Sequence, residues 1–394
     1  MAPKSSNKPC NLGAKRKHLH EMRTIKDAIE AKPGNTSGFD YLRITLAFSV
    51  LASHSIVCSY GLTGENSARA SELWLPVWWP LIRSITPSFF ALSGFLIAGS
   101  LERNTLPAFL ALRGLRIFPA LAVEIVLSAI VIGTITTTLP LSAYFADPLF
   151  YRYFLNLIGD VHFYLPGVFN DLPLPDYVNV QLWTIPYEMR CYLIIAALFT
   201  VVRYPRIYFV GVFSSVAALT LWTVKTHALP PVRELPAGEG TMLVFSFLFG
   251  VALYLLRSFI PYNRLLFGGT LVLSWLLLQR SGTIYLATLP ISYVTVFMGL
   301  QRPRRTIIIR SADYSYGVYL YGFPIQQLVA LTFPQWRFAS FNFAVSAPLA
   351  LFCAWFSWTF IELFALSHKK VIVEFANAFS ERLRKNIICR PRSS

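Results

Sequence analysis

The sequence has 394 residues, of which 55% are hydrophobic and only 14% are charged, and its formal net charge is +16. Soluble globular proteins carry about 25% charged residues, so this composition excludes a soluble enzyme, a disordered scaffold and a coiled coil. It predicts instead an all-α, polytopic membrane protein.

The chain divides into a long apolar region between two basic tails. Residues 1–39 are polar and basic and lack the apolar segment of a signal peptide, so we expect an N-terminal tail. Residues 40–366 are expected to form one transmembrane domain, and residues 367–394 a C-terminal basic tail. The domain contains ten apolar runs, each compatible with a spanning helix of about 20 residues. They lie at 41–61, 77–99, 117–138, 182–201, 207–224, 241–256, 265–279, 284–300, 314–332 and 342–366.

The positive charges predict the orientation of these helices. With the N-terminus in the cytoplasm, the inner segments carry 27 Lys and Arg residues and the outer segments carry seven. This asymmetry predicts two cytoplasmic termini and an even number of spans. The location that we expect for this multi-pass protein is the inner (plasma) membrane. It explains the net charge without a nucleic-acid partner, and the basic tails suit anionic membrane lipid. The five cysteines lack metal-ligand spacing, so we expect no metal site.

Ionisable residues inside the first helix are candidates for function, because charge is costly within a bilayer. Arg43 and His54 stand eleven residues apart, which places them on one helix face about 16 Å apart along the axis. His54 would lie in the outer half of the membrane and Arg43 near its inner side. A polar packing contact is the alternative for His54.

Glu188 lies early in the fourth run, at the depth expected for His54. A carboxylate beside an imidazole fixes its tautomer and raises its basicity, so the two residues could form a catalytic pair. The alternative is that Glu188 pairs with an arginine.

Two arginines stand at the inner end of the third run. Arg113 and Arg116 are three residues apart and share a helix face, where two planar guanidinium groups suit phosphate. Positive-inside anchoring is the alternative. Glu124 lies two turns deeper and is expected to neutralise one of these arginines. Glu362, near the end of the last run, could likewise serve only as the structural partner of an arginine.

Two further segments stand out. The segment FFALSGFLI (89–97) places Ser93 and Gly94 in an apolar helix, which permits close helix approach. The outer loop at 139–181 is long and rich in proline and aromatic residues, so we expect it to be ordered.

Taken in order, these residues resemble the acyltransferase-3 family of integral membrane acyltransferases, over about residues 40–366. The branch that O-acetylates bacterial polysaccharides and rhizobial lipochitooligosaccharides is the most similar. The segments that carry the resemblance are FDYLRITLAFSVLASH (39–54), FFALSGFLI (89–97), RGLRIFPAL (113–121), LPGVFNDLPLPDYVNVQLWTIPYEM (165–189) and SYGVYLYGFPIQQ (315–327). Val180 and Gln181 depart from the branch, which often has Gly-Ser there.

The resemblance implies transfer of an acyl group, most often acetyl, from cytoplasmic acetyl-CoA to a sugar hydroxyl of a glycan or glycolipid. It implies that His54 is the catalytic histidine, as a general base or as an acyl carrier, and that Glu188 belongs to the active site. It also implies that Arg43, Arg113 and Arg116 serve the CoA side.

Trp183 and Tyr187 would supply surface for stacking against a sugar, with anchoring at the membrane interface as the alternative. The competing functions are a glycan or lipid transporter or flippase, because buried charges also mark transport paths, and a non-catalytic receptor or assembly factor.

Overall fold

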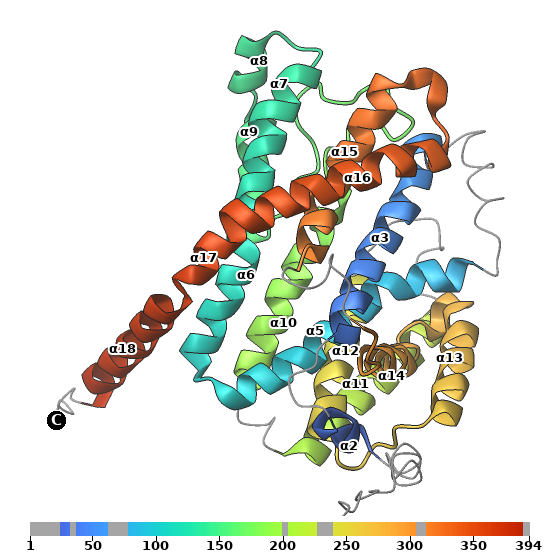
Figure 1. The fold of residues 1–394 in the computed structure, drawn as a ribbon, viewed down its shortest axis with the longest axis vertical. Helices are drawn as coiled ribbons and strands as arrows, with labels where there is room; N and C mark the ends of the chain where they lie inside the picture. The colour runs from blue at the N-terminus through green and yellow to red at the C-terminus, as the bar shows by residue number, and fades with distance from the viewer. Residues whose placement is uncertain are drawn as a thin grey trace, which may run out of the picture.

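The computed structural model describes residues 24–31, 37–61, 78–198, 204–226, 239–304 and 313–388. Within these ranges the protein is helical, and β pairing is confined to three isolated bridges. The predicted all-α class is therefore confirmed. Figure 1 shows the helices gathered in one bundle, with the loop after α7 at one end and α2 at the other.

Each predicted apolar run contains a helix. The ten helices are α3 (Ser37–Tyr60), α5 (Trp79–Arg103), α6 (Leu106–Val126), α10 (Ile185–Ala197), α11 (Pro205–Thr226), α12 (Glu239–Leu255), α13 (Arg264–Leu278), α14 (Thr288–Gly299), α15 (Ser315–Thr332) and α16 (Ala339–Ser357).

Five helical segments of the described chain are long and apolar enough to cross a membrane. They are Ser37–Tyr60, Trp79–Arg103, Leu106–Thr136, Pro205–Thr226 and Ala339–Ala378. Helices α10, α12, α13 and α14 have 12 to 17 residues. At 1.5 Å per residue they span about 18–26 Å, less than the ~30 Å hydrocarbon core. A membrane protein is thus supported, and the count of ten spans stays a prediction.

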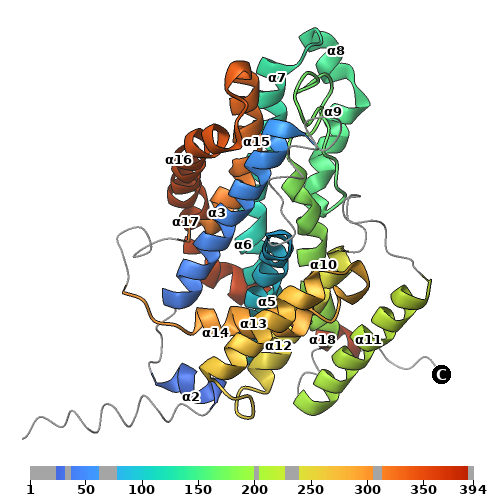
Figure 2. The ribbon, with the colours of Figure 1, turned by 90° about the vertical axis from the view of Figure 1, so that its right-hand side faces the viewer.

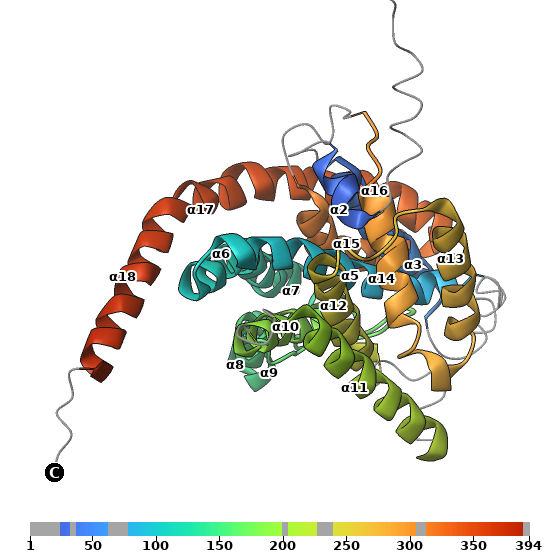
Figure 3. The same cartoon turned by 90° about the horizontal axis from the view of Figure 1, so that it is seen from below.

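Two helices are longer than their apolar runs. Helix α6 begins at Leu106, where the Thr105 side chain caps it, and it continues through a π-helix (Leu127–Ile132) into α7 (Gly133–Thr136). Helix α16 continues through a second π-helix (Trp358–Glu362) and α17 (Leu363–Ser367), and α18 (Lys369–Ile388) follows. Seen from below, α16, α17 and α18 curve around α6 (Figure 3).

The outer loop is ordered, as its composition predicts. It contains α8 (Leu141–Ala146), α9 (Pro148–Tyr153) and a 3-10 turn (Phe154–Ile158). Its fully buried side chains include Tyr144, Tyr153 and Val178. These anchors hold the loop against the bundle and lead into the 3-10 turn Val180–Thr184, which opens α10.

Part of the N-terminal tail packs against the bundle. Helix α2 (Ile25–Glu30) starts with a capping box between Thr24 and Asp27. Ile25 and Ala28 are buried, and the Ile25 amide donates to the Ile260 carbonyl at 3.0 Å. This contact joins two segments that were both predicted to face the cytoplasm.

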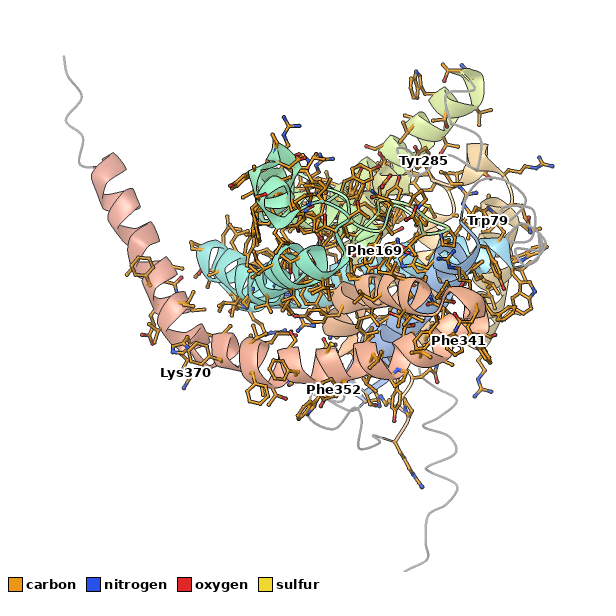
Figure 4. The ribbon with its side chains drawn as sticks, turned by 90° about the horizontal axis from the view of Figure 1, so that it is seen from above. Trp79, Phe169, Tyr285, Phe341, Phe352 and Lys370 are labelled. Carbon is orange, nitrogen blue, oxygen red and sulfur yellow. The ribbon has the colours of Figure 1, made fainter. Side chains whose placement is uncertain are left out.

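The surface of the bundle suits lipid. Large apolar side chains such as Leu265, Ile135 and Phe352 are more than half exposed. In the view from above, Phe352 projects from the outer face of the α16 arm and Lys370 lies further along it (Figure 4). Exposed large apolar side chains are typical of helices that face hydrocarbon rather than water.

Candidate active site

Helices α3, α5, α6, α10 and α15 surround a cavity of about 140 Å³. Helix α3, which supplies both Arg43 and His54, packs against α15 and α16 (Figure 2). The polar side chains lining the cavity are Arg43, Thr86, Ser93, Arg113, Arg116, Thr184, Glu188, Tyr192, Ser315, Tyr316 and Tyr319. The three arginines assigned to the CoA side thus converge from two helices.

Two of these arginines are held by one carboxylate that the sequence analysis missed. Asp313 Oδ2 accepts from Arg43 Nη1 at 3.1 Å and from Arg116 Nη2 at 2.7 Å. Burial alone would raise the pKa of Asp313, but the two guanidinium groups outweigh it and lower that pKa to about 2. Asp313 is the one acidic residue between positions 300 and 332. A lone carboxylate beside an apolar run was the sequence signal that could have identified it as a partner for the arginines.

Arg116 has a second acidic partner, because its Nη1 lies 2.9 Å from Glu362 Oε2. The interpretation of Glu362 as the structural partner of an arginine is therefore confirmed. The residue sits in the π-helix that follows α16, which brings the far end of the chain to the cavity.

Arg113 has no ion pair within the described residues. Its guanidinium lies 6.0 Å from the centre of the Phe109 ring, and its Nε is buried without a hydrogen-bond partner. A cavity-lining guanidinium without a carboxylate partner is suited to an anion, and phosphate oxygens match its planar geometry.

Glu188 lies in the first turn of α10 and faces the arginines rather than the histidine. Its Oε1 accepts a short hydrogen bond from the Tyr192 hydroxyl, and the charges of Arg116, Arg113 and Arg43 act on its carboxylate. No contact joins it to His54 in the described structure. The predicted His54–Glu188 pair is not observed, because equal depth on two helices does not fix the direction in which each side chain points.

His54 lies outside the cavity lining. Its ring meets Phe323 edge-on with 5.3 Å between centroids, and its Nδ1 is buried without a partner. The Gln181 side chain lies within interaction distance of the imidazole. Nδ1 is thus the ring nitrogen that is both buried and unpaired, whereas Nε2 is not.

Glu124 does not neutralise an arginine, and that expectation was wrong. It is 1% exposed, and its Oε1 accepts from Ser128 Oγ and from Asn179 Nδ2, both at 2.7 Å. The loop residue Asn179 therefore supplies the partner that the arginines were expected to supply.

Trp183 and Tyr187 pack together with 5.9 Å between ring centroids. Both are partly buried against the core, and the Arg190 guanidinium lies 5.1 Å from the Tyr187 ring centre. Neither residue lines the cavity.

The predicted close approach at Ser93 and Gly94 is present. A Cβ at Gly94 would collide with the Phe247 carbonyl, and one at Gly250 with the Ala91 carbonyl. Helices α5 and α12 thus meet through two glycines. No cluster of three or more potential metal ligands occurs in the described ranges.

These features define a helical membrane protein with a cavity lined by three arginines. The family model for the acyltransferase domain matches residues 36–362, and the chain belongs to this acyltransferase-3 family. An "O-acetyl transferase" of Shigella phage Sf6 is 25% identical over 337 residues, covering 82% of this chain and 94% of the relative. No solved structure matches the chain. The predicted family and its O-acetyltransferase activity are confirmed.

Proposed function

We propose that this O-acetyltransferase moves an acetyl group from cytoplasmic acetyl-CoA to a sugar hydroxyl of a bacterial surface polysaccharide or glycolipid, within the inner membrane. The observation that carries the donor assignment is the cavity in which Arg43, Arg113 and Arg116 converge. The O-acetyl transferase of the phage supports acetyl as the transferred group.

The donor would bind with its phosphates at Arg113, whose charge has no acidic partner within ion-pair distance among the described residues. Asp313 and Glu362 hold Arg116 in place through ion pairs, and Asp313 also holds Arg43. Glu188 would act on this donor side, where it limits the excess positive charge of the cavity. The pantetheine arm would then run along α3 toward His54, about 16 Å from Arg43 along the helix axis.

The reaction assigns His54 the role of general base. Its neutral Nε2 takes the proton of the sugar hydroxyl while the oxygen attacks the thioester carbonyl. The carbon–sulfur bond breaks, the acetyl ester forms, and the departing thiolate takes the proton from the imidazolium to give CoA. In a second route Nε2 attacks the thioester carbonyl and CoA leaves as the thiolate. The sugar oxygen then attacks the acetyl-imidazole, the bond to Nε2 breaks, and the hydroxyl proton passes to the thiolate to give CoA. Trp183 and Tyr187 would lie on the acceptor side.

Mass spectrometry of surface glycans tests the proposal, in cells that express wild type or His54→Ala at equal protein level. We expect an added acetyl mass in wild type that is absent in the variant. His162→Ala, a substitution in the outer loop, is the matched control and should keep the added mass. Persistence of the acetyl mass in His54→Ala would overturn the role of His54. A change in glycan amount or location without any acetyl difference would indicate transport instead.

A further inference from the structure

A proline in α15, the helix on which His54 packs, leaves one backbone carbonyl without its helical hydrogen bond. Pro324 lies inside the helix and has no amide hydrogen, so the carbonyl four residues earlier, that of Leu320, lacks its helical donor. Two side chains from the segment before α10 fill that position. Asn179 Nδ2 donates to the Leu320 oxygen at 3.0 Å, and Gln181 Nε2 does so at 3.4 Å.

These bonds fix the orientation of the Gln181 amide. Its nitrogen also donates to the Tyr319 carbonyl, and both backbone partners are acceptors only. The NH₂ group must therefore face α15 and the oxygen must point away from it. Gln181 is 2% exposed, and its Oε1 is buried without a partner.

His54 has the complementary unpaired atom. Its Nδ1 is buried without a partner, and its ring packs on Phe323, next to Gly322, where the Gln181 amide also lies. A buried donor and a buried acceptor, each without a partner and on neighbouring side chains, are costly unless they bond to each other.

We propose that Gln181 is a positioning residue for His54: its Oε1 accepts the Nδ1 proton and keeps Nε2 free as the proton-accepting nitrogen. This inference rests on the proposed role of His54. The tautomer of a histidine is set by the hydrogen bond that its other nitrogen makes. Pro324 contributes indirectly, because the Leu320 carbonyl that it frees is one of the two acceptors that hold the amide nitrogen on α15 and leave the oxygen on the side of the imidazole.

Gln181→Met tests the proposal, since methionine keeps the length and removes the acceptor. Partners that orient metal-bound histidines typically contribute about 10–100-fold in affinity or activity, and by analogy we expect kcat to fall by a similar factor. The affinity for CoA should stay unchanged, because Gln181 does not line the arginine cavity. Gln327→Met is the matched control: it removes another buried amide that donates to two backbone carbonyls and has an unpaired Oε1, and it should leave kcat unchanged.

The tautomer gives a readout independent of activity. In ¹⁵N-histidine solid-state NMR, with the His54 signal identified by its loss in His54→Ala, we expect the Nδ1–H form in wild type and a mixture in Gln181→Met. Pro324→Ala should shift the same signal while Gln181 remains, because it returns an amide donor to Leu320. This second variant tests the proposal if Gln181→Met does not fold.

Unchanged kcat in folded Gln181→Met, an equal loss in Gln327→Met, or an unchanged tautomer would overturn the inference. Full activity in His54→Ala would instead overturn the proposed function, on which the inference depends. Loss of activity in His54→Ala together with full activity in Gln181→Met would remove only the role of Gln181.

Discussion

The arginine cavity and the surroundings of His54 use different chemistry to place polar groups inside a membrane protein. In the cavity, Arg43 and Arg116 are ions held by the carboxylates of Asp313 and Glu362. Around His54 the buried polar groups are mostly neutral amides bonded to backbone carbonyls, as with Gln181, Gln326 and Gln327. The difference teaches that charge is concentrated where an anionic donor would enter, and that proton transfer would take place in a neutral setting.

The sharpest way to separate the two regions is to remove the imidazole. His54→Ala should lower kcat for acetyl transfer by about 10²–10⁴-fold, which is the usual contribution of a general base. It should leave the Kd for CoA unchanged, because His54 does not line the cavity. Single-turnover transfer and CoA titration on the purified protein measure both quantities. A large loss of CoA affinity would contradict the separation.

Removing a cavity charge should have the opposite pattern. Arg113→Ala should weaken CoA binding, because a hydrogen bond to a charged group contributes about 1.5–3 kcal/mol, or roughly 10–100-fold in Kd. Single-turnover kcat at saturating donor should change much less. Arg103→Ala, at the exposed C-terminal end of α5, carries the same charge change and should leave the Kd unchanged. Equal weakening by both variants would indicate attraction by net charge rather than a site.

The ion pairs of the cavity can be broken while its shape is kept. Asp313→Asn should lower the free energy of unfolding by about 1–3 kcal/mol, because it leaves the partners of Asp313 incompletely satisfied. CoA should then raise the melting temperature of the variant more than that of wild type, since the freed guanidinium groups can bind its phosphates. Glu30→Gln, which removes an exposed pair with Lys26, is the control and should change neither value.

The low pKa of Asp313 also fixes the sign of the pH effect. The depressed value, about 2, means that its ion pairs stabilise the fold above the unfolded-state pKa. That stability is lost only as the pH falls toward 2. Between about pH 5 and 8 the Asp313 contribution should be constant. A change in the melting temperature of wild type across that range that is absent in Asp313→Asn would contradict this.

Local periodicity made much of the fold and half of the site predictable. The ten apolar runs each became a helix, and the spacing of Arg113 and Arg116 placed both on the cavity face of α6. The features that the sequence did not predict are contacts between residues far apart in the chain. Asp313 is 270 positions from Arg43, and no pattern within one helix reports such a contact. The direction of Glu188, toward the arginines instead of His54, likewise depends on how α10 is rotated against its neighbours.

Glu124 is an ionisable residue among the otherwise mostly neutral polar groups around His54. Substituting it is the test of this comparison with the smallest expected effect. Its Oε1 accepts from Ser128 and Asn179, while Oε2 is buried without a partner. Glu124→Gln keeps the accepting oxygen, and the unpaired Tyr153 hydroxyl lies within electrostatic range of the side chain that would carry the new NH₂ group. We expect unfolding stability within about 1 kcal/mol of wild type and unchanged acetyl transfer.

Glu124→Leu should instead cost about 1–3 kcal/mol, because it leaves the Asn179 and Ser128 donors buried and less well satisfied. Thermal unfolding in detergent, together with the transfer assay, distinguishes the two variants. If Glu124→Gln abolished transfer while it remained folded, a carboxylate would be required in the region of His54. The separation between a charged donor cavity and a neutral surrounding for His54 would then fail, because the proton-transfer region would depend on a second ionisable group 70 positions along the chain from His54.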